Sequence, residues 1–153
     1  MLARRSLTKK ELKDRLKKFE PIVDVVLQLI DYLDSKGFID EAGIIEDKII
    51  LGKESKLYGR MRIMLELRKR GLQPEIIADS INQFFPLDEE FDVAFKFVRR
   101  KLNSMGGVSG LRRYRRLAGA LQRRGFSGEI IARALEQSGI SRFDEADTNI
   151  EFQ

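Results

Sequence analysis

One phrase occurs twice in this chain, and it constrains the fold more than any other feature. Residues 70–78, RGLQPEIIA, return 54 positions later as residues 124–132, RGFSGEIIA. The similarity extends upstream, where Arg62 corresponds to Arg116. Self-similarity at a fixed period is typical of a repeat architecture, in which each unit buries its apolar face against a neighbour. The sequence therefore predicts stacked copies of one helical unit.

Each copy of the phrase has the pattern of a helix, a glycine stop, a short turn and a second helix. Gly71 and Gly125 stand where the C terminus of a helix favours a residue that tolerates positive φ. Basic side chains before each glycine suit the negative end of the helix dipole. Proline occurs only three times, and no stretch alternates apolar and polar residues as a strand would. These patterns predict an all-α fold.

Apolar spacing divides the chain into three units of three short helices, of which the third is incomplete. The predicted units are residues 1–52, 53–104 and 105–153, and the last includes a weakly ordered acidic tail. A polar connector at 52–56 separates the first two units, and a flexible glycine-rich linker at 103–110 precedes the helices of the third unit.

Several local predictions concern helix starts and buried faces. Thr8 and Glu11 have the spacing of a capping box. Pro21 suits the first position of the second helix, and Asp40 is expected to open the third. The aromatic residues and the isoleucine pairs are assigned to the core. The second helix carries an apolar stripe at helical spacing: Ile22, Val25, Val26, Leu29, Ile30 and Leu33.

The composition argues against catalytic and metal chemistry. The 153 residues include no Cys and no His, so a zinc site would have to use carboxylates alone and the commonest general base is missing. No glycine-rich phosphate loop precedes a Lys-Ser or Lys-Thr pair. We therefore expect no catalytic residue, no metal and no cofactor. Because no apolar run could span a bilayer and no signal-peptide pattern occurs, a cytoplasmic protein without membrane contact is expected.

Charge is distributed in blocks along the chain, whose formal net charge is +5. Residues 93–128 carry ten Lys or Arg and no acid, whereas residues 71–92 carry six acids and no base. Like charges repel unless a partner neutralises them, so the basic block favours binding of nucleic acid or an acidic protein. The alternative is a solvated helix surface without a partner.

The candidate binding residues are basic clusters on three predicted helices. Arginine predominates over lysine, which suits bidentate contact with phosphate or carboxylate. Tyr58 and Tyr114 stand among them and can stack on bases, although core packing is the commoner role. The candidates are Arg60, Arg62, Arg68, Lys69, Arg70, Arg99, Arg100, Lys101, Arg112, Arg113, Arg115, Arg116, Arg123 and Arg124.

Four phrases follow one another along the chain: SLTKKELKDRL at 6–16, GFIDE at 37–41, YGRMRIMLELRKRG at 58–71 and RRGFSGEIIA at 123–132. Taken together, they resemble the RecX family of bacterial modulators of the RecA recombinase. They occur in the family's order and span almost the whole chain. The resemblance implies an elongated, curved array of tandem three-helix repeats, and a monomer is expected.

The resemblance also implies a function. Members bind in the groove of the RecA filament on single-stranded DNA and limit filament growth, strand exchange, ATP hydrolysis and co-protease action. The residues alone indicate helices, repeats and basic faces, which leaves a direct nucleic-acid-binding protein as an alternative. An enzyme is the third possibility, disfavoured by the missing His, Cys and nucleotide-binding loop.

Overall fold

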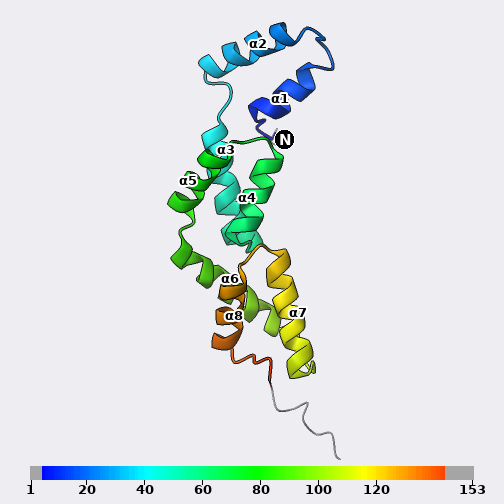
Figure 1. Ribbon diagram of the computed structural model, residues 1–153, viewed down its shortest axis with the longest axis vertical. Coiled ribbons are helices and arrows are strands. Elements are labelled where there is room, and N and C mark those ends of the chain that lie inside the picture. Colours follow the sequence, from blue (N-terminus) through cyan, green and yellow to red (C-terminus); the bar gives the residue numbers. More distant parts are fainter. Residues whose placement is uncertain (1–4, 144–153) are drawn as a thin grey trace, which may run out of the picture.

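The computed structural model describes residues 5–143, which form eight α-helices and no strand. The helices are α1 (Lys9–Leu16), α2 (Val23–Ser35), α3 (Glu41–Ile50), α4 (Arg60–Lys69), α5 (Pro74–Phe84), α6 (Leu87–Leu102), α7 (Gly110–Arg123) and α8 (Gly128–Gln137). Figure 1 shows an elongated body with α1 and α2 at one end and α7 and α8 at the other. The predicted all-α fold is confirmed, whereas the acidic tail at 144–153 lies outside the described residues.

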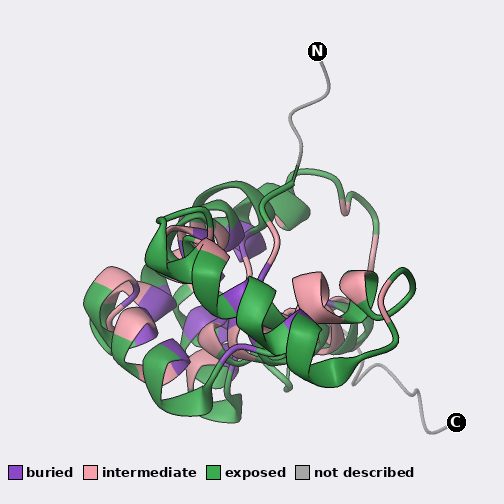
Figure 2. Ribbon diagram, turned by 90° about the horizontal axis from the view of Figure 1, so that it is seen from above, coloured by how far each residue is buried: buried purple, intermediate pink, exposed green. Residues whose placement is uncertain are grey.

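Buried apolar side chains collect in two cores, and the view along the body in Figure 2 shows buried positions on the inner sides of the helices. The first core joins α3, α4 and α5: Ile44, Ile45, Ile49, Ile63, Leu67, Leu72, Ile77, Ile81 and Phe85. The second joins α6, α7 and α8 and also holds Leu57: Phe91, Ala94, Phe97, Val98, Leu117, Leu121, Phe126, Ile131, Ala134, Leu135 and Ile140. Each core contains residues from both sides of one expected unit boundary, 52/53 or 104/105. The cores therefore do not test the division into three units, which stays a prediction.

Both glycine stops have the predicted conformation. The φ angle is +83° at Gly71 and +84° at Gly125. The N–H of Gly71 donates to the carbonyl of Arg68 at 2.9 Å, and that of Gly125 donates to the carbonyl of Gln122 at 3.0 Å. The repeated phrase therefore specifies the same helix end twice, because the conformation depends mainly on local backbone chemistry.

Most predicted helix starts are also present. Thr8 and Glu11 form the capping box at α1, and the side chain of Asp40 accepts a backbone N–H of α3 at 2.9 Å. The start expected at Pro21 is wrong by two residues, because the chain stays extended before α2 begins at Val23.

The buried stripe predicted for α2 is largely wrong. Only Val26 and Ile30 of its six residues are buried. α2 packs chiefly on α1, and one short neighbouring helix cannot cover a broad apolar face. Side chains assigned to the core from sequence that are exposed instead are Phe19, Ile22, Val25, Leu29, Tyr32, Phe38 and Ile76.

The polar connector predicted at 52–56 is helical as well. It continues α3 as a π-helical segment, Leu51–Lys56. A Cβ at Gly52 would lie 2.8 Å from the side chain of Ile63, so the missing side chain lets this segment approach α4 closely. Lys53 Nζ donates to the carboxylate of Glu89 at 2.8 Å and thereby ties the segment to α6.

The start of one helix docks on the glycine stop of a later one, and this contact occurs twice. At α4, the N–H of Gly59 donates to the carbonyl of Arg124 at 2.7 Å. A Cβ on Gly59 would lie 2.6 Å from the carbonyl carbon of Gly125. At α1, the hydroxyl of Thr8 donates to the carbonyl of Arg70 at 2.7 Å. We call these contacts the α4–α7 junction and the α1–α4 junction.

An ion pair strengthens the α1–α4 junction. The guanidinium of Arg70 donates to the two carboxylate oxygens of Glu11 at 2.9 and 3.0 Å, and Arg5 approaches the same carboxylate at 3.2 Å. These contacts, led by the hydrogen bond from Arg70, lower the pKa of Glu11 from 4.5 to about 2. Because the pKa is lower in the folded state than in the unfolded state, the pair stabilises the fold above about pH 4.5. That stabilisation is lost as the pH falls from about 4.5 to about 2.

We expect Glu11→Gln to lower the free energy of unfolding at neutral pH by about 1 kcal/mol, since solvent screens this partly exposed pair. The variant should also lose part of the acid sensitivity of the wild type between pH 4.5 and 2. Thermal unfolding followed across this range measures both effects. Glu136→Gln, at an exposed carboxylate on α8, is the control and should behave as wild type. If the wild type and Glu11→Gln lose stability equally between pH 4.5 and 2, the stabilising role given to the Glu11 carboxylate is contradicted.

Candidate functional site

The fourteen basic side chains predicted to bind a partner fall into two groups. Five are partly buried and bonded within the fold: Arg60, Arg62, Arg70, Arg113 and Arg124. Nine are exposed: Arg68, Lys69, Arg99, Arg100, Lys101, Arg112, Arg115, Arg116 and Arg123. Within residues 5–143, none of these nine forms an ion pair with a carboxylate. The exposed group is therefore available to a partner.

Arg62 and Arg124 serve the α4–α7 junction. Their guanidinium groups lie 5.2 and 5.6 Å from the ring centroid of Tyr58, and such contacts stabilise an aromatic ring packed between cations. Arg62 also donates to Glu66 at 2.9 Å, while Arg124 lies 4.4 Å from the ring centroid of Phe97. Tyr58 is thus engaged in internal packing rather than presented to solvent.

Arg113 and Arg60 are also engaged internally. Arg113 donates to the carbonyl of Val108 at 2.9 Å, which turns its charge toward the linker before α7. Its Nε is buried and has no hydrogen-bond partner in the described part of the chain. Arg60 donates to the side-chain oxygen of Asn82 on α5.

Four of the nine exposed cations lie together on α7. Arg112, Arg116 and Arg123 are spaced by four and seven residues, which places them on one face of a helix, and Arg115 adjoins them. Gly119 stands in the middle of this stripe. A Cβ there would meet only the Nη1 of Arg123, at 3.2 Å. The centre of the cationic stripe therefore has no side chain of its own, and the guanidinium of Arg123 lies beside it.

Two hollows flank the stripe and share Arg123. One of about 500 Å³ lies between the end of α6 and α7 and is lined by Lys101, Ser104, Met105, Arg115, Arg116, Leu117, Ala120 and Arg123. The other, of about 330 Å³, lies between α4 and α7 and is lined by Met61, Arg62, Met64, Leu65, Arg68, Gln122, Arg123 and Gly125. Neither lining includes Asp or Glu. We call the two hollows together the basic groove.

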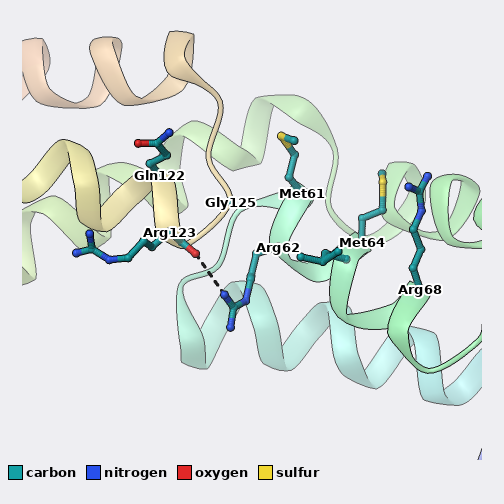
Figure 3. A pocket seen from close by; sticks show the side chains of 8 residues that line it. Met61, Arg62, Met64, Arg68, Gln122, Arg123 and Gly125 are labelled. Carbon is teal, nitrogen blue, oxygen red and sulfur yellow. Dashed lines mark hydrogen bonds between the residues drawn. The ribbon is translucent and has the colours of Figure 1, made fainter.

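Figure 3 shows how the second hollow is built. Arg62 points its guanidinium toward the carbonyl of Arg123, 3.5 Å away, which closes one side of the hollow. The side chains of Met61 and Met64 line the α4 side, with Arg68 beyond them. Met61 and Leu65 are 65% and 49% exposed. A cationic rim beside exposed apolar side chains suits an extended anionic partner that also has apolar parts.

Two further features of the described residues concern metal ions and membranes. Within residues 5–143, no three Asp, Glu, His or Cys side chains are grouped so that they could hold a metal ion. No helix in that range is long and apolar enough to cross a membrane.

Sequence reasoning missed the role of Glu90. The carboxylate of Glu90 accepts the backbone N–H of Arg60 at 2.9 Å, so it caps α4 from α6. The residue is 4% exposed, and burial raises the pKa of its carboxyl group. Glu90 stands in the first turn of α6, where an acidic residue ordinarily interacts with the dipole of its own helix. No local spacing encodes a contact with a helix that starts 30 residues earlier.

Sequence comparison finds one family model and several proteins that the chain resembles. The family model described as "RecX, third three-helix domain" matches residues 88–135, which cover nearly all of α6 through most of α8. A protein named regulatory protein RecX from Caldanaerobacter subterraneus is 32% identical over 141 residues, which cover 88% of this chain and 65% of that protein. The RecX of Thermobifida fusca is 28% identical over 144 residues, with 92% and 77% covered. The chain thus spans about two thirds to three quarters of the length of these relatives.

Solved structures share the fold. A crystal structure of RecX from Lactobacillus salivarius superimposes with a TM-score of 0.77 at 20% identity, covering 92% of this chain and 90% of that one. A second RecX crystal structure gives a TM-score of 0.74 at 20% identity, covering 87% of this chain and 65% of that one. The matched domain, the similar sequences and the shared helical fold agree with the four phrases, and the chain belongs to the RecX family.

Proposed function

We propose that this chain is a non-enzymatic regulator that binds the RecA filament on single-stranded DNA and limits filament growth, ATP hydrolysis, strand exchange and co-protease action. The family supports a regulatory role, since the relatives are named regulatory proteins. The observation that carries the proposal is the basic groove, where three of the four exposed arginines of α7, Arg115, Arg116 and Arg123, line hollows without a carboxylate. RecA action in the cytoplasm would place this chain there.

The dimensions of the basic stripe favour a polymeric anionic partner. Arg112 and Arg123 are eleven residues apart on one helix, which corresponds to about 16 Å at 1.5 Å per residue. A single small anion would contact only one part of such a stripe. A filament that combines phosphates with acidic protein surface can contact all of it, and arginine forks suit both phosphate and carboxylate.

The test is a titration of RecA ATPase activity on single-stranded DNA. The proposal predicts that the steady-state rate falls as this protein is added, and that the protein is retained on immobilised RecA filaments. An unchanged rate together with no retention would contradict it. The same retention experiment on naked single-stranded DNA addresses the second candidate, a direct nucleic-acid binder, which the acid-free groove also supports. Strong retention on DNA alone that falls steeply with salt would favour that alternative.

Gly119→Ala separates stability from binding. A glycine inside a helix is less stable than alanine by about 0.5–1 kcal/mol, and the added methyl group would meet only a mobile arginine tip. We therefore expect the free energy of unfolding to rise by about that amount. If a partner approaches the bare backbone closely, overpacking should raise the concentration needed for half-inhibition of RecA roughly fivefold or more.

Gly128→Ala is the control for this prediction, because its methyl group would meet no atom within 4 Å at the start of α8. Chemical denaturation measures stability, and the ATPase titration measures inhibition. Unchanged inhibition by a stabilised Gly119→Ala protein would show that no partner approaches this part of α7.

A further inference from the structure

The described chain ends beside α7, the helix that carries the basic stripe. The guanidinium of Arg142 lies 5.5 Å from the ring centroid of Tyr114 on α7. Arg142 also lines a third hollow, of about 660 Å³, along α7 and α8. Met61, Gln122 and Gly125 belong both to this hollow and to the α4–α7 hollow of the basic groove. The two hollows therefore adjoin, and the one that contains Arg142 leads into the groove.

The residues that follow have the composition complementary to the groove. Residues 144–153, DEADTNIEFQ, include four carboxylates and no Lys or Arg. Ile150 and Phe152 add apolar side chains near the carboxylate of Glu151. The groove offers the opposite arrangement, with arginines and a lysine at its rim and methionine and leucine beside them. We call residues 144–153 the acidic segment.

The acidic segment is also long enough to reach every part of the groove. Ten residues span at most about 33–36 Å when extended. The fourteen residues of α7 correspond to about 21 Å at 1.5 Å per residue. From Phe143, Glu151 is eight residues away, or about 26–29 Å of extended chain, so its carboxylate can reach Arg123, Arg116 and Arg115.

We propose that the acidic segment is an internal competitor for the basic groove, which pairs its carboxylates with Arg115, Arg116 and Arg123 and so weakens binding of the anionic partner. The proposal rests on the function proposed above, because it assumes that the same groove binds that partner. Exposed ion pairs are individually weak. A short tether raises the effective concentration of the segment to the millimolar range, so weak contacts suffice for competition.

The test uses the full chain in two forms. The tail-neutral variant carries Asp144→Asn, Glu145→Gln, Asp147→Asn and Glu151→Gln. The probe is a fluorescent synthetic peptide with the sequence of residues 144–153, and fluorescence anisotropy measures its binding at low and high salt. At low salt the peptide should bind the tail-neutral variant about threefold to tenfold more tightly than the wild type, whose own segment competes. High salt should abolish the difference because it screens exposed charges.

Two controls locate the effect. Adding Arg115→Glu, Arg116→Glu and Arg123→Glu to the tail-neutral variant should remove peptide binding, and undiminished binding would overturn the proposal. A second full-chain variant neutralises four exposed carboxylates elsewhere, through Glu46→Gln, Asp47→Asn, Glu54→Gln and Asp79→Asn. It should bind the peptide as the wild type does. If it gains as much affinity as the tail-neutral variant, net charge explains the result and the proposal is wrong.

The RecA titration separates this inference from the proposed function. If both hold, the tail-neutral variant should inhibit RecA at about threefold to tenfold lower concentration than the wild type. Equal peptide binding by the two proteins, with normal RecA inhibition, would overturn the competitor role and leave the proposed function intact. The opposite result is also possible: the peptide competes as expected, but neither the wild type nor the tail-neutral variant inhibits RecA. That result would overturn the proposed function, while the contact between the segment and the groove would stand.

Discussion

Gly125→Ala should destabilise the protein by about 3 kcal/mol or more, whereas Gly139→Ala should cost only about 1 kcal/mol. Both glycines have positive φ, +84° and +71°, so both variants incur the same kind of backbone strain. The difference lies in what a Cβ would meet. At Gly139 nothing lies within 4 Å, whereas at Gly125 the new atom would lie 2.8 Å from the Cα of Arg62 and overlap its backbone nitrogen. The α4–α7 junction would have to open.

Two further substitutions separate strain from overlap. Gly71→Ala combines positive φ with a clash against Lys10, whose Cβ is fixed by the backbone of α1 and would lie 2.6 Å away, so we expect a loss of about 2 kcal/mol or more. Gly59→Ala has an ordinary φ of −75° but would press on the carbonyl of Gly125, so overlap alone should cost about 2 kcal/mol or more. Urea unfolding followed by circular dichroism at 222 nm measures all four. Equal losses at Gly125 and Gly139 would mean that close contact at the junction does not stabilise the fold.

The features that sequence predicted correctly are set by short stretches of chain. The repeated phrase specified two helix ends, and Gly71 and Gly125 adopt the expected left-handed conformation. The capping box of Thr8 and Glu11 is likewise local. Such features depend on a few neighbouring residues, so the printed sequence contains all the information needed to predict them.

Burial was less predictable, because an apolar stripe shows which side of a helix prefers contact but not whether a neighbour exists. The stripe on α2 has helical spacing, yet Ile22 is 58% exposed while Val26 is 1% exposed. Among the described helices, α1 is the main neighbour of α2. The cap that Glu90 provides for α4 was missed for a related reason, since it depends on how α6 lies relative to α4.

At the candidate site too, the sequence does not show which arginines are bonded within the fold and which are exposed, even at positions that correspond in the two copies of the repeat. Arg70 and Arg124 begin the two copies of the repeated phrase, and each holds a junction, Arg70 through Glu11 and Arg124 through Tyr58 and Phe97. Arg62 and Arg116 also correspond, yet they differ. Arg62 lies at the α4–α7 junction and donates to Glu66, whereas Arg116 is exposed at the rim of the basic groove. Equivalent sequence positions can therefore stabilise one unit and remain free for binding in another, and only the packing distinguishes them.

That distinction determines the residues for the decisive test of the groove. The stripe variant reverses the four exposed arginines of α7: Arg112→Glu, Arg115→Glu, Arg116→Glu and Arg123→Glu. Arg113 is left unchanged because it donates to the carbonyl of Val108 and supports the linker. The four reversed side chains are exposed, so helicity should be preserved. If the groove binds the RecA filament, each lost contact should cost between well under 1 and about 3 kcal/mol, depending on how fully the interface excludes water.

Even about 0.7 kcal/mol per arginine would total about 3 kcal/mol, which raises the half-inhibitory concentration in the RecA ATPase titration roughly 100-fold. The control variant reverses four exposed lysines outside the groove, Lys17, Lys18, Lys36 and Lys96. It changes the net charge by the same amount, so any general electrostatic attraction should fall equally in both. Inhibition should persist in the control variant and be nearly lost in the stripe variant. The difference between their half-inhibitory concentrations should become smaller at high salt, because salt weakens the arginine contacts that the control variant retains. Equal inhibition by the two variants would exclude α7 from the interface, because charge position would then not matter.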